Sequence, residues 1–358
     1  MELRPEAPVG WDSRGSLPIL SEGFAEACRA VGYRPRFVED SHDRALVLLR
    51  GVPLPVAWSW TLRAKVYVEQ GHPAFVATLL TRLRRLGVAH IKINDEVHGL
   101  PHATVSPWPG VTLKRRYVFV IETAGRSDRD LLAPMHDPVP RNIRKAERAG
   151  VVVDEVRSEE DLQAFTTLIE QTSDRIRARN VASVYPREFF VAAFRSMVKQ
   201  GQALFLLARA DGQPLAAQMY LVSKRKLTYY HGGSTRDREL TPKHGSTAAF
   251  WHALRLARDR DMELFDLGGA SPTTDRANAQ FSLSDFKRRW GGGLVMVPCA
   301  DAVLAPVKAA FQDRCLKPFW DRAHPLYLRL FRTVPRCIPP VAAVLGPAAG
   351  SVTCELFS

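Results

Sequence analysis

One stretch of the sequence, residues 203–234, limits the possible folds more than any other. It reads ALFLLARADGQPLAAQMYLVSKRKLTYYHGGS and consists of apolar runs of strand length, with Asp211-Gly212 between the first run and the second. An Asp-Gly pair between two such runs is typical of a tight turn that joins antiparallel strands. The stretch therefore predicts three antiparallel strands that follow one another along the chain.

The residues on both sides of this stretch predict helices and one further strand. Residues 159–176 place apolar side chains at helical spacing, and residues 244–261, HGSTAAFWHALRLARDRD, predict a second helix. Residues 262–269, MELFDLGG, predict a buried strand. This order of helix, antiparallel strands, helix and strand is typical of an acyltransferase domain of the GNAT type.

The first part of the chain shows a weaker version of the same order. The segment HPAFVATLLTRLRRLG predicts a helix that is followed by a strand in HIKIND, much as the later helix is followed by ELFDLGG. We therefore predict an α/β (α+β) chain with two similar domains, residues 1–135 and 136–298, each a mixed sheet flanked by helices. Residues 299–358 would form a basic, Pro-rich tail that is helical in part.

The composition is that of a folded protein with a basic surface. Hydrophobic residues make up 46% and charged residues 24%, and 50 Lys+Arg against 37 Asp+Glu leave a net charge of +13. Such an excess favours a polyanionic partner, although a basic surface that maintains solubility is the alternative. The five cysteines include no C-x-x-C pair, which fits a reducing cytoplasm and gives no sign of a zinc site.

Targeting and membrane segments are not expected. The N-terminus lacks the apolar region of a secretory signal, and the longest apolar tract, CIPPVAAVLGPAAGSVT, is interrupted by prolines and too short to cross a membrane. We expect a cytoplasmic monomer whose tail packs on a domain. A basic amphipathic tail that touches the inner, anionic membrane surface is the alternative.

Several enzyme classes lack their motifs in this sequence. It contains no H-E-x-x-H, no G-x-S-x-G and no G-x-x-x-x-G-K-[ST], so we expect no metal, no serine nucleophile and no P-loop. An acyltransferase that uses coenzyme A usually holds the pyrophosphate with a loop of the form [QR]-x-x-G-x-[GA]. Here Gly245 would be the central glycine, but Pro242 and Thr247 occupy the outer positions. Because proline has no N–H to donate, this loop favours a different acyl donor.

Two regions carry closely spaced cations. In residues 141–150, RNIRKAERAG, four cations recur at helical spacing, and a phosphate-rich ligand explains them better than a solvated helix face does. Further on, Arg175 and Arg179 precede Tyr185 and predict either a diphosphate site or an ordinary helix end. Both regions remain open to the plainer interpretation.

The third cationic group, Lys287 to Arg289, lies between Phe286 and Trp290. In one interpretation the Lys287 ammonium stabilises an oxyanion or a phosphate. In the other, Lys287 extends past the two aromatic rings to reach water. The preceding aromatic run, Tyr229 to His231, lines the same pocket or simply packs in the core.

Four motifs occur in an order and spacing that resemble one family. PRNIRKAERAGV, TYYHGGSTRDREL, ELFDLGG and FSLSDFKRRWGG are similar to motifs of the Fem-type peptidyltransferases, the FemA, FemB and FemX group, over about residues 11–298. The resemblance implies a pair of GNAT-like domains with a cleft between them. It also implies transfer of an amino acid from aminoacyl-tRNA to an amine of a peptidoglycan precursor, with no cofactor beyond that donor. Some relatives use a small natural-product amine or hydroxylamine instead.

The resemblance also implies roles for individual residues. Lys287 and Asp95 would be catalytic, with Asp95 or the substrate taking the proton of the acceptor amine. Asp266, Gly268, Gly269 and Phe286 would shape the cleft. The expected contacts with tRNA phosphates are Arg141, Arg144, Lys145, Arg148 and Lys243. The expected contacts with the acceptor are Arg175, Arg179, Tyr185 and Tyr230, on the assumption that domain 1–135 holds the acceptor side and domain 136–298 the donor side.

The sequence departs from the family pattern at two places. It has no heptad-bearing insertion for the coiled-coil arm that some members carry, so it resembles the armless type. Asp95 is followed by Glu96, where the family usually shows Asp-Pro. The alternative function is an N-acyltransferase that uses acyl-coenzyme A in polysaccharide or lipid biosynthesis, because sequences of that group share F-D-x-G and the late F-K.

Overall fold

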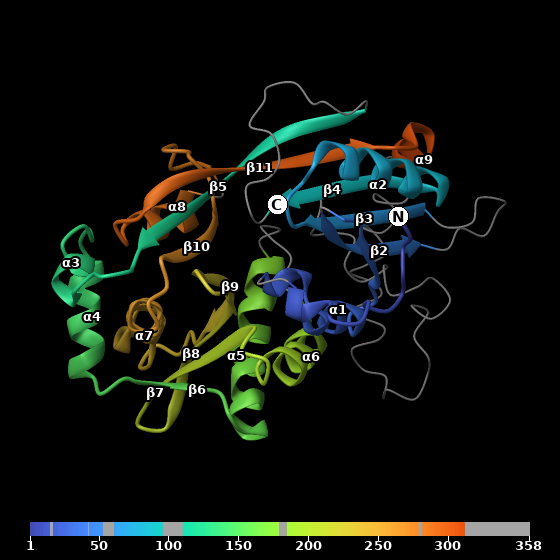
Figure 1. Cartoon of the computed structure of the whole chain (residues 1–358). Coiled ribbons are helices and arrows are strands. Elements are labelled where there is room, and N and C mark those ends of the chain that lie inside the picture. Colours follow the sequence, from blue (N-terminus) through green and yellow to red (C-terminus); the bar gives the residue numbers. More distant parts are fainter. Residues whose placement is uncertain are drawn as a thin grey trace. The chain divides into compact units, whose positions relative to one another are not determined.

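The computed structural model describes residues 1–14, 17–41, 43–52, 61–95, 110–178, 185–278 and 281–311. The chain divides into two compact units (Figure 1). The first unit comprises Met1–Arg14, Cys28–Arg115 and Pro298–Ser358, and the second comprises Gly15–Ala27 and Arg116–Val297. These units are discontinuous, whereas the domains expected from the sequence were the continuous ranges 1–135 and 136–298. The difference arises where β5 (Val111–Glu122) and β11 (Gly293–Val303) pass from one unit into the other.

The first unit is built on a mixed sheet. Its strands, in spatial order, are β1 (Arg34–Glu39), β2 (Arg44–Val52), β3 (Thr61–Val68), β4 (Val88–Asp95) and the end of β11. Neighbours are antiparallel except β3 and β4, which are parallel and joined through helix α2 (Pro73–Arg85). The short elements of this unit are η1 (Asp12–Arg14) and α9 (Pro306–Phe311).

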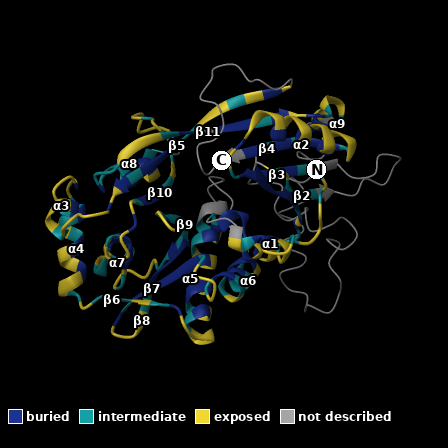
Figure 2. Cartoon of the chain, in the orientation of Figure 1, coloured by how far each residue is buried: buried dark blue, intermediate teal, exposed yellow. Residues whose placement is uncertain are grey.

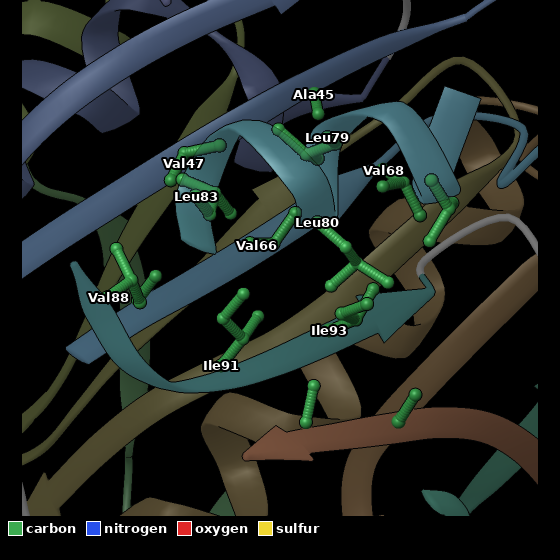
Figure 3. Close-up of a cluster of buried hydrophobic side chains, with 14 of the residues drawn as sticks. Ala45, Val47, Val66, Val68, Leu79, Leu80, Leu83, Val88, Ile91 and Ile93 are labelled. Carbon is green, nitrogen blue, oxygen red and sulfur yellow. The ribbon is translucent and has the colours of Figure 1, made fainter. Parts of the chain in front are cut away.

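The core of the first unit lies between α2 and one face of this sheet. Alternate residues of the strands, such as Val47, Val66 and Ile91, pack against Leu79 and Leu83 of α2 (Figure 3). The sequence predicted this helix and the strand after it, and Gly87, the last residue of the segment HPAFVATLLTRLRRLG, has the positive φ of 76° that is common after a helix end. The helix and strand predicted here are therefore confirmed.

The second unit contains the other sheet strands and most of the helices. Its strands, in spatial order, are the end of β5, β10 (Leu264–Ala270), β9 (Lys226–Ser234), β8 (Gln213–Val222), β7 (Ala203–Ala210) and β6 (Val152–Glu155). The predicted run of three antiparallel strands is confirmed as β7, β8 and β9. Asp211 and Gly212 form the turn, with φ of 50° and 75°. Strand β10 is parallel to β9 and antiparallel to β5.

Helices cover both faces of the second unit's sheet. The elements are η2 (Pro18–Leu20), α1 (Glu22–Arg29), α3 (Asp128–Leu132), α4 (Val139–Arg148), α5 (Glu159–Ala178), α6 (Arg187–Met197), η3 (Thr241–Lys243), α7 (Gly245–Asp259) and α8 (Phe281–Arg288). On one face Phe205 of β7 contacts Phe165 of α5, with ring centres 4.9 Å apart. On the other face Leu206 belongs to the same core cluster as Phe250 and Leu254 of α7. Strands β7 and β8 of this sheet are buried on both sides, as Figure 2 shows.

The predicted fold class, mixed sheets flanked by helices, is thus confirmed. Helices α1, α6 and α8 and strands β1 and β11 lie outside the elements expected from the sequence. Strand β11 includes residues 299–303, which were expected to belong to the tail but pair with β4. Within the described residues, every helix is too short or too polar to cross a membrane. The predicted tail, residues 299–358, lies outside the described residues from position 312 onward.

Candidate functional site

The candidate site lies where strands β9 and β10 of the second unit stop pairing. Their parallel ladder joins Leu264–Asp266 to Lys226–Thr228. Just beyond it β10 has an irregularity between Asp266 and Gly269, and Gly268 adopts a φ of 77°. A Cβ at Gly268 would lie 3.0 Å from the carbonyl oxygen of Tyr229, so only glycine fits comfortably. Bulges of this kind interrupt a ladder and expose backbone groups next to functional sites.

Lys287 of α8 points to this interruption. Its residue is 4% exposed, and its Nζ donates a hydrogen bond of 2.6 Å to the carbonyl oxygen of Gly269. The ammonium also lies 6.0 Å from the ring centre of Tyr229. Burial lowers the pKa of Lys287 to about 8, against the opposing attraction of the Asp266 carboxylate. The ammonium is therefore held inside the protein and does not extend to water, whereas its catalytic role stays a prediction.

Side chains of α8 form hydrogen bonds with the end of β10 and with the residues that follow it. Ser284 is 1% exposed, and its Oγ accepts a 2.8 Å hydrogen bond from the backbone N–H of Ser271. Arg288 donates to the carbonyl oxygen of Thr273 at 3.3 Å. Together with Lys287, these side chains lie at helical spacing on one face of α8 and determine the course of residues 269–273.

Aromatic rings anchor α8 on the core. Phe286 lies 5.5 Å from Phe250 of α7 between ring centres, and Trp290, which is fully buried, lies 5.5 Å from the same ring. The neighbouring cation Arg289, which directly follows α8, is bound to Asp285 of that helix at 2.7 Å. The aromatic residues around the cations therefore position the helix, and of the three cations only Lys287 is buried.

Asp266 lies close to Lys287 and holds the backbone of the bulge. Its residue is 5% exposed, and its carboxylate accepts a 2.7 Å hydrogen bond from the backbone N–H of Gly268. Its other oxygen lies 3.5 Å from Nζ of Lys226. The structure thus brings Asp266, Gly268, Gly269 and Lys287 together at one point, as the sequence motifs suggested.

A second bulge, on β9, places two aromatic residues on the same face. Met219 pairs with His231 and Tyr220 with Tyr229, so Tyr230 is an extra residue in the ladder. Tyr229 contacts Phe250 on the α7 side, with ring centres 4.7 Å apart. Tyr230 and His231 lie on the opposite face, with ring centres 4.7 Å apart. This arrangement was not predictable from the run TYYH.

Of the predicted acceptor residues, Tyr185 lies beside Tyr230, and Arg175 contacts the end of β9. The Tyr185 and Tyr230 rings are 6.3 Å apart and nearly parallel, and Phe189 of α6 stacks on Tyr185 at 4.0 Å. Arg175 of α5 donates to Thr172 at 2.6 Å and to the carbonyl oxygen of Ser234, at the end of β9, at 3.0 Å.

Two predicted site residues have side chains that lie outside the described part of the chain. Arg179 lies outside the described residues. Asp95 is the last residue of β4, in the first unit, and its side chain lies outside the described part of the chain. The acceptor role of Arg179 and the catalytic role of Asp95 both stay predictions.

The predicted tRNA-binding cations lie on the exposed face of α4. Arg141, Arg144, Lys145 and Arg148 are exposed, while Ile143 and Ala146 are buried. Lys243, just before α7, is half-buried and paired with Asp211 at 2.5 Å.

The pKa of His244 is lowered by partial burial and by the positive charges of this region. Partial burial lowers the pKa of His244, and the nearby charges of Lys145 and Arg141 lower it further. The start of α7 therefore lies in a positive electrostatic field, which suits an anionic ligand.

A buried polar chain beneath the start of α7 was missed by the sequence interpretation. The Tyr220 hydroxyl donates to Gln218 at 2.5 Å, and the Gln218 amide donates to the carbonyl oxygen of Ser246 at 3.1 Å. Burial raises the pKa of Tyr220 well above its usual value. A glutamine inside an otherwise apolar strand is the signal that would have revealed this contact.

The described residues contain no group of His, Cys, Asp and Glu side chains suited to a metal ion. The site therefore consists of one buried ammonium, backbone groups freed by two bulges, aromatic rings and a nearby cationic helix. Such a site can bind an anionic or carbonyl-containing group and stabilise negative charge that develops on it.

Comparisons with known proteins agree with this fold. Residues 139–288 match the family model described as the acetyltransferase (GNAT) domain. The crystal structure of FemX matches with a TM-score of 0.61 and 15% identity, over 83% of this chain and 94% of that one. No curated protein sequence matches the chain significantly.

Two other solved structures show the same architecture. The C-terminal domain of a putative lysylphosphatidylglycerol synthetase from Agrobacterium fabrum matches with a TM-score of 0.54 and 15% identity, over 84% of this chain and 93% of that one. A conserved protein of unknown function from Bacteroides thetaiotaomicron matches with a TM-score of 0.55 and 7% identity, over 84% and 99%. The chain therefore has a Fem-like GNAT fold, with an acyltransferase domain of the GNAT type at residues 139–288.

Proposed function

We propose that this protein is an aminoacyltransferase that moves an amino acid from aminoacyl-tRNA to an amine acceptor, with a peptidoglycan precursor as the first acceptor to test. The observation that carries the proposal is the position of Lys287. Its ammonium is buried at the interruption between β9 and β10 and touches a backbone carbonyl oxygen. A fixed positive charge in a poorly solvated place can stabilise the oxyanion formed when an amine attacks an ester.

The reaction needs little else from the protein. An aminoacyl ester is already activated, so no covalent enzyme intermediate is required. The attacking amine must lose a proton, which would pass to Asp95 or to a group of the substrate. With a pKa of about 8, Lys287 is mostly protonated at neutral pH and is able to act as the positively charged group.

The surroundings of α7 favour tRNA as the donor. Pro242 lies within η3 and has no N–H for a phosphate, and His244 has a left-handed φ of 57°. Beside this helix start, α4 presents exposed cations to solvent. Such a face suits the extended phosphate backbone of an RNA and would position the donor without reading its sequence.

Acyl-coenzyme A is the second candidate donor. The family model that matches residues 139–288 describes an acetyltransferase domain, and helix α7 still begins with the buried glycine Gly245. Backbone N–H groups in the first turn of a helix are able to hold a pyrophosphate. This alternative would retain the acyl transfer chemistry and change only the donor.

The test supplies both donors separately. The purified chain would be incubated with radiolabelled aminoacyl-tRNA pools and, in parallel, with labelled acyl-coenzyme A, each with a cell-wall precursor carrying a free amine. We expect label to move from tRNA. Transfer from coenzyme A alone contradicts the proposal and supports the alternative.

The acceptor is tested in a second set of reactions. The name of the Agrobacterium fabrum relative refers to lysylphosphatidylglycerol, so phosphatidylglycerol vesicles form one arm, beside the peptidoglycan precursor and a small hydroxylamine. Label in the precursor supports the proposed acceptor. Label in the lipid or in the small amine alone keeps aminoacyl transfer but replaces the acceptor.

A further inference from the structure

The carboxylate of Asp266 acts on two lysines that come from different elements. Its residue is buried, and one carboxylate oxygen lies 3.5 Å from Nζ of Lys226 on β9. The other oxygen accepts the hydrogen bond from the backbone N–H of Gly268. The carboxylate also attracts the ammonium of Lys287, which comes from α8. One buried negative charge is therefore shared by two positive charges, and the two lysines do not use it equally.

Lys226 holds the carboxylate in a direct ion pair. The backbone of Lys226 is fixed at the start of β9, because Oγ of Ser223 accepts a hydrogen bond from its N–H and donates one to its carbonyl oxygen, both at 3.0 Å. In the parallel ladder Lys226 lies beside Leu264, two residues before Asp266. The two side chains are mostly shielded from water, so solvent and salt screen their attraction less than that of an exposed pair.

Lys287 has a neutral partner instead. Its Nζ donates to the carbonyl oxygen of Gly269 at 2.6 Å, and among the described residues no carboxylate lies at ion-pair distance from it. The acidic residue of α8, Asp285, is paired with Arg289 at 2.7 Å. Burial raises the pKa of the Tyr229 phenol above its usual range, so that group stays neutral beside the ammonium. The positive charge of Lys287 is thus held without a counter-ion in direct contact.

A charge without a direct counter-ion is what binding of a substrate oxygen requires. A carboxylate in contact with an ammonium cancels most of its field at short range. If Asp266 turned towards Lys287, it would neutralise the ammonium and repel an oxyanion that develops beside it. The ion pair with Lys226 and the hydrogen bond from Gly268 both hold Asp266 in its observed position.

We propose that Lys226 is a positioning residue for Lys287: it binds the Asp266 carboxylate and so leaves the Lys287 ammonium available to an oxygen of the substrate. This inference deepens the proposed function and rests on it, since the substrate oxygen is that of the aminoacyl ester. The arrangement of the three charges does not depend on the donor. It is measurable in the protein without any substrate.

The first experiment follows the ionisation of Lys287 by NMR in the full chain. Protein labelled with carbon-13 at Cε of its lysines is titrated from about pH 6 to 10.5, and the Lys287 signal is assigned by its absence in Lys287→Arg. The native midpoint should lie at about 8. In Lys226→Met the carboxylate is released to Lys287 and a neighbouring positive charge is lost, so the midpoint should rise by about one pH unit.

Two further variants serve as controls. Lys226→Arg keeps the ion pair, and Lys224→Met removes an exposed cation from the turn before β9, so both should titrate within a few tenths of a pH unit of the native protein. If Lys226→Met does not fold, Lys226→Gln replaces it with the same expected rise. An unchanged or lower midpoint without Lys226 would overturn the proposal. Equal rises in Lys226→Met and either control would also overturn it, because the charge at position 226 would then have no special effect.

Transfer assays separate this inference from the proposed function. Lys226→Met should lower kcat about tenfold at pH 7.5 with little change in KM, because the ammonium is neutralised by Asp266, and Lys226→Arg should restore the rate. A native kcat together with a raised midpoint would overturn the positioning role. If the native chain transfers from neither donor, the proposed function fails, whereas a raised midpoint in Lys226→Met still supports the sharing of Asp266 between the two lysines.

Discussion

The sheets of the two units use their second faces differently. In the second unit β7 reads ALFLLARA and is buried on both sides, between α5 and α7. In the first unit β3 reads TLRAKVYV, and its alternate residues divide between a core under α2 and the other face, where Arg63 and Lys65 are half-buried and Tyr67 is buried. The continuous apolar run of β7 thus accompanies burial on two faces, whereas β3 mixes buried residues and half-buried cationic residues on the face that α2 does not cover. The candidate site in the second unit therefore lies where its sheet is interrupted, at β9 and β10.

The largest effect should follow from opening a cavity in the doubly covered sheet. Phe205 of β7 is 1% exposed and contacts Phe165 and Phe194. Phe205→Ala should lower the free energy of unfolding by roughly 3–5 kcal/mol, because both the ring contacts and the filled volume are lost.

Denaturant unfolding of Phe205→Ala and of the native chain measures this loss. An unchanged free energy of unfolding in Phe205→Ala would show that burial of β7 on both faces does not stabilise the second unit.

Removing the buried ammonium should affect catalysis strongly. Lys287→Ala should lower the transfer rate about 100- to 1,000-fold, the usual loss when a donor to a developing oxyanion is deleted. Arg289→Ala is the matched control, since its guanidinium is bound to Asp285 at 2.7 Å. A normal rate in Lys287→Ala would show that the lysine only links α8 to the carbonyl oxygen of Gly269 and has no catalytic role.

The same lysine should give the native enzyme a characteristic pH profile. Because the pKa of Lys287 is about 8, the fraction of protein with a charged ammonium falls as the pH rises through that value. We expect the rate to decline above pH 8, measured with a donor whose stability is corrected at each pH. A rate that stays constant to pH 9.5 would contradict a role for the charged form.

Stability should depend on pH through Lys287 in a predictable direction. The pKa of about 8 in the folded chain lies below the ordinary 10.5, so burial of the charge costs stability below pH 8. This cost disappears as the pH rises from 8 to 10.5, which at 1.36 kcal/mol per pH unit corresponds to roughly 3 kcal/mol. The native chain should therefore gain stability over that interval relative to Lys287→Met. Denaturant unfolding of both proteins at pH 7.5 and 10.5 measures this gain. An equal difference in their free energies of unfolding at the two pH values would contradict the prediction.

The smallest effect concerns the cations of α4. Arg144→Gln/Arg148→Gln should weaken tRNA binding about tenfold at moderate salt and reduce the slope of log affinity against log salt by roughly 1.5–2, as expected for two lost phosphate contacts. The control Arg157→Gln/Lys199→Gln removes two exposed cations outside α4. Equal slopes for the two variants would mean that α4 carries no special contact.

The sequence alone predicted the elements that have a strong pattern. The strands β7, β8 and β9, the helices α2, α4, α5 and α7, and the strand β10 follow from apolar periodicity, Asp-Gly and Gly stops. It also identified Lys287 as the unusual cation between Phe286 and Trp290. Helices α6 and α8 were not predicted, because aromatic residues close to charged ones do not by themselves distinguish a short helix from a loop.

Only the tertiary structure decided how the residues of the candidate site lie relative to one another. The burial of Lys287, its contact with Gly269 and the extra residue at Tyr230 depend on strand register, and a shift of one residue changes the face that a side chain occupies. The cations of the first unit's sheet become neighbours in the same way, since Arg50, Arg63 and Lys65 are far from His90 and Lys92 in sequence and meet only through pairing of β2, β3 and β4. Periodicity is a local property that a sequence displays directly, whereas neighbours across strands are set by the whole fold.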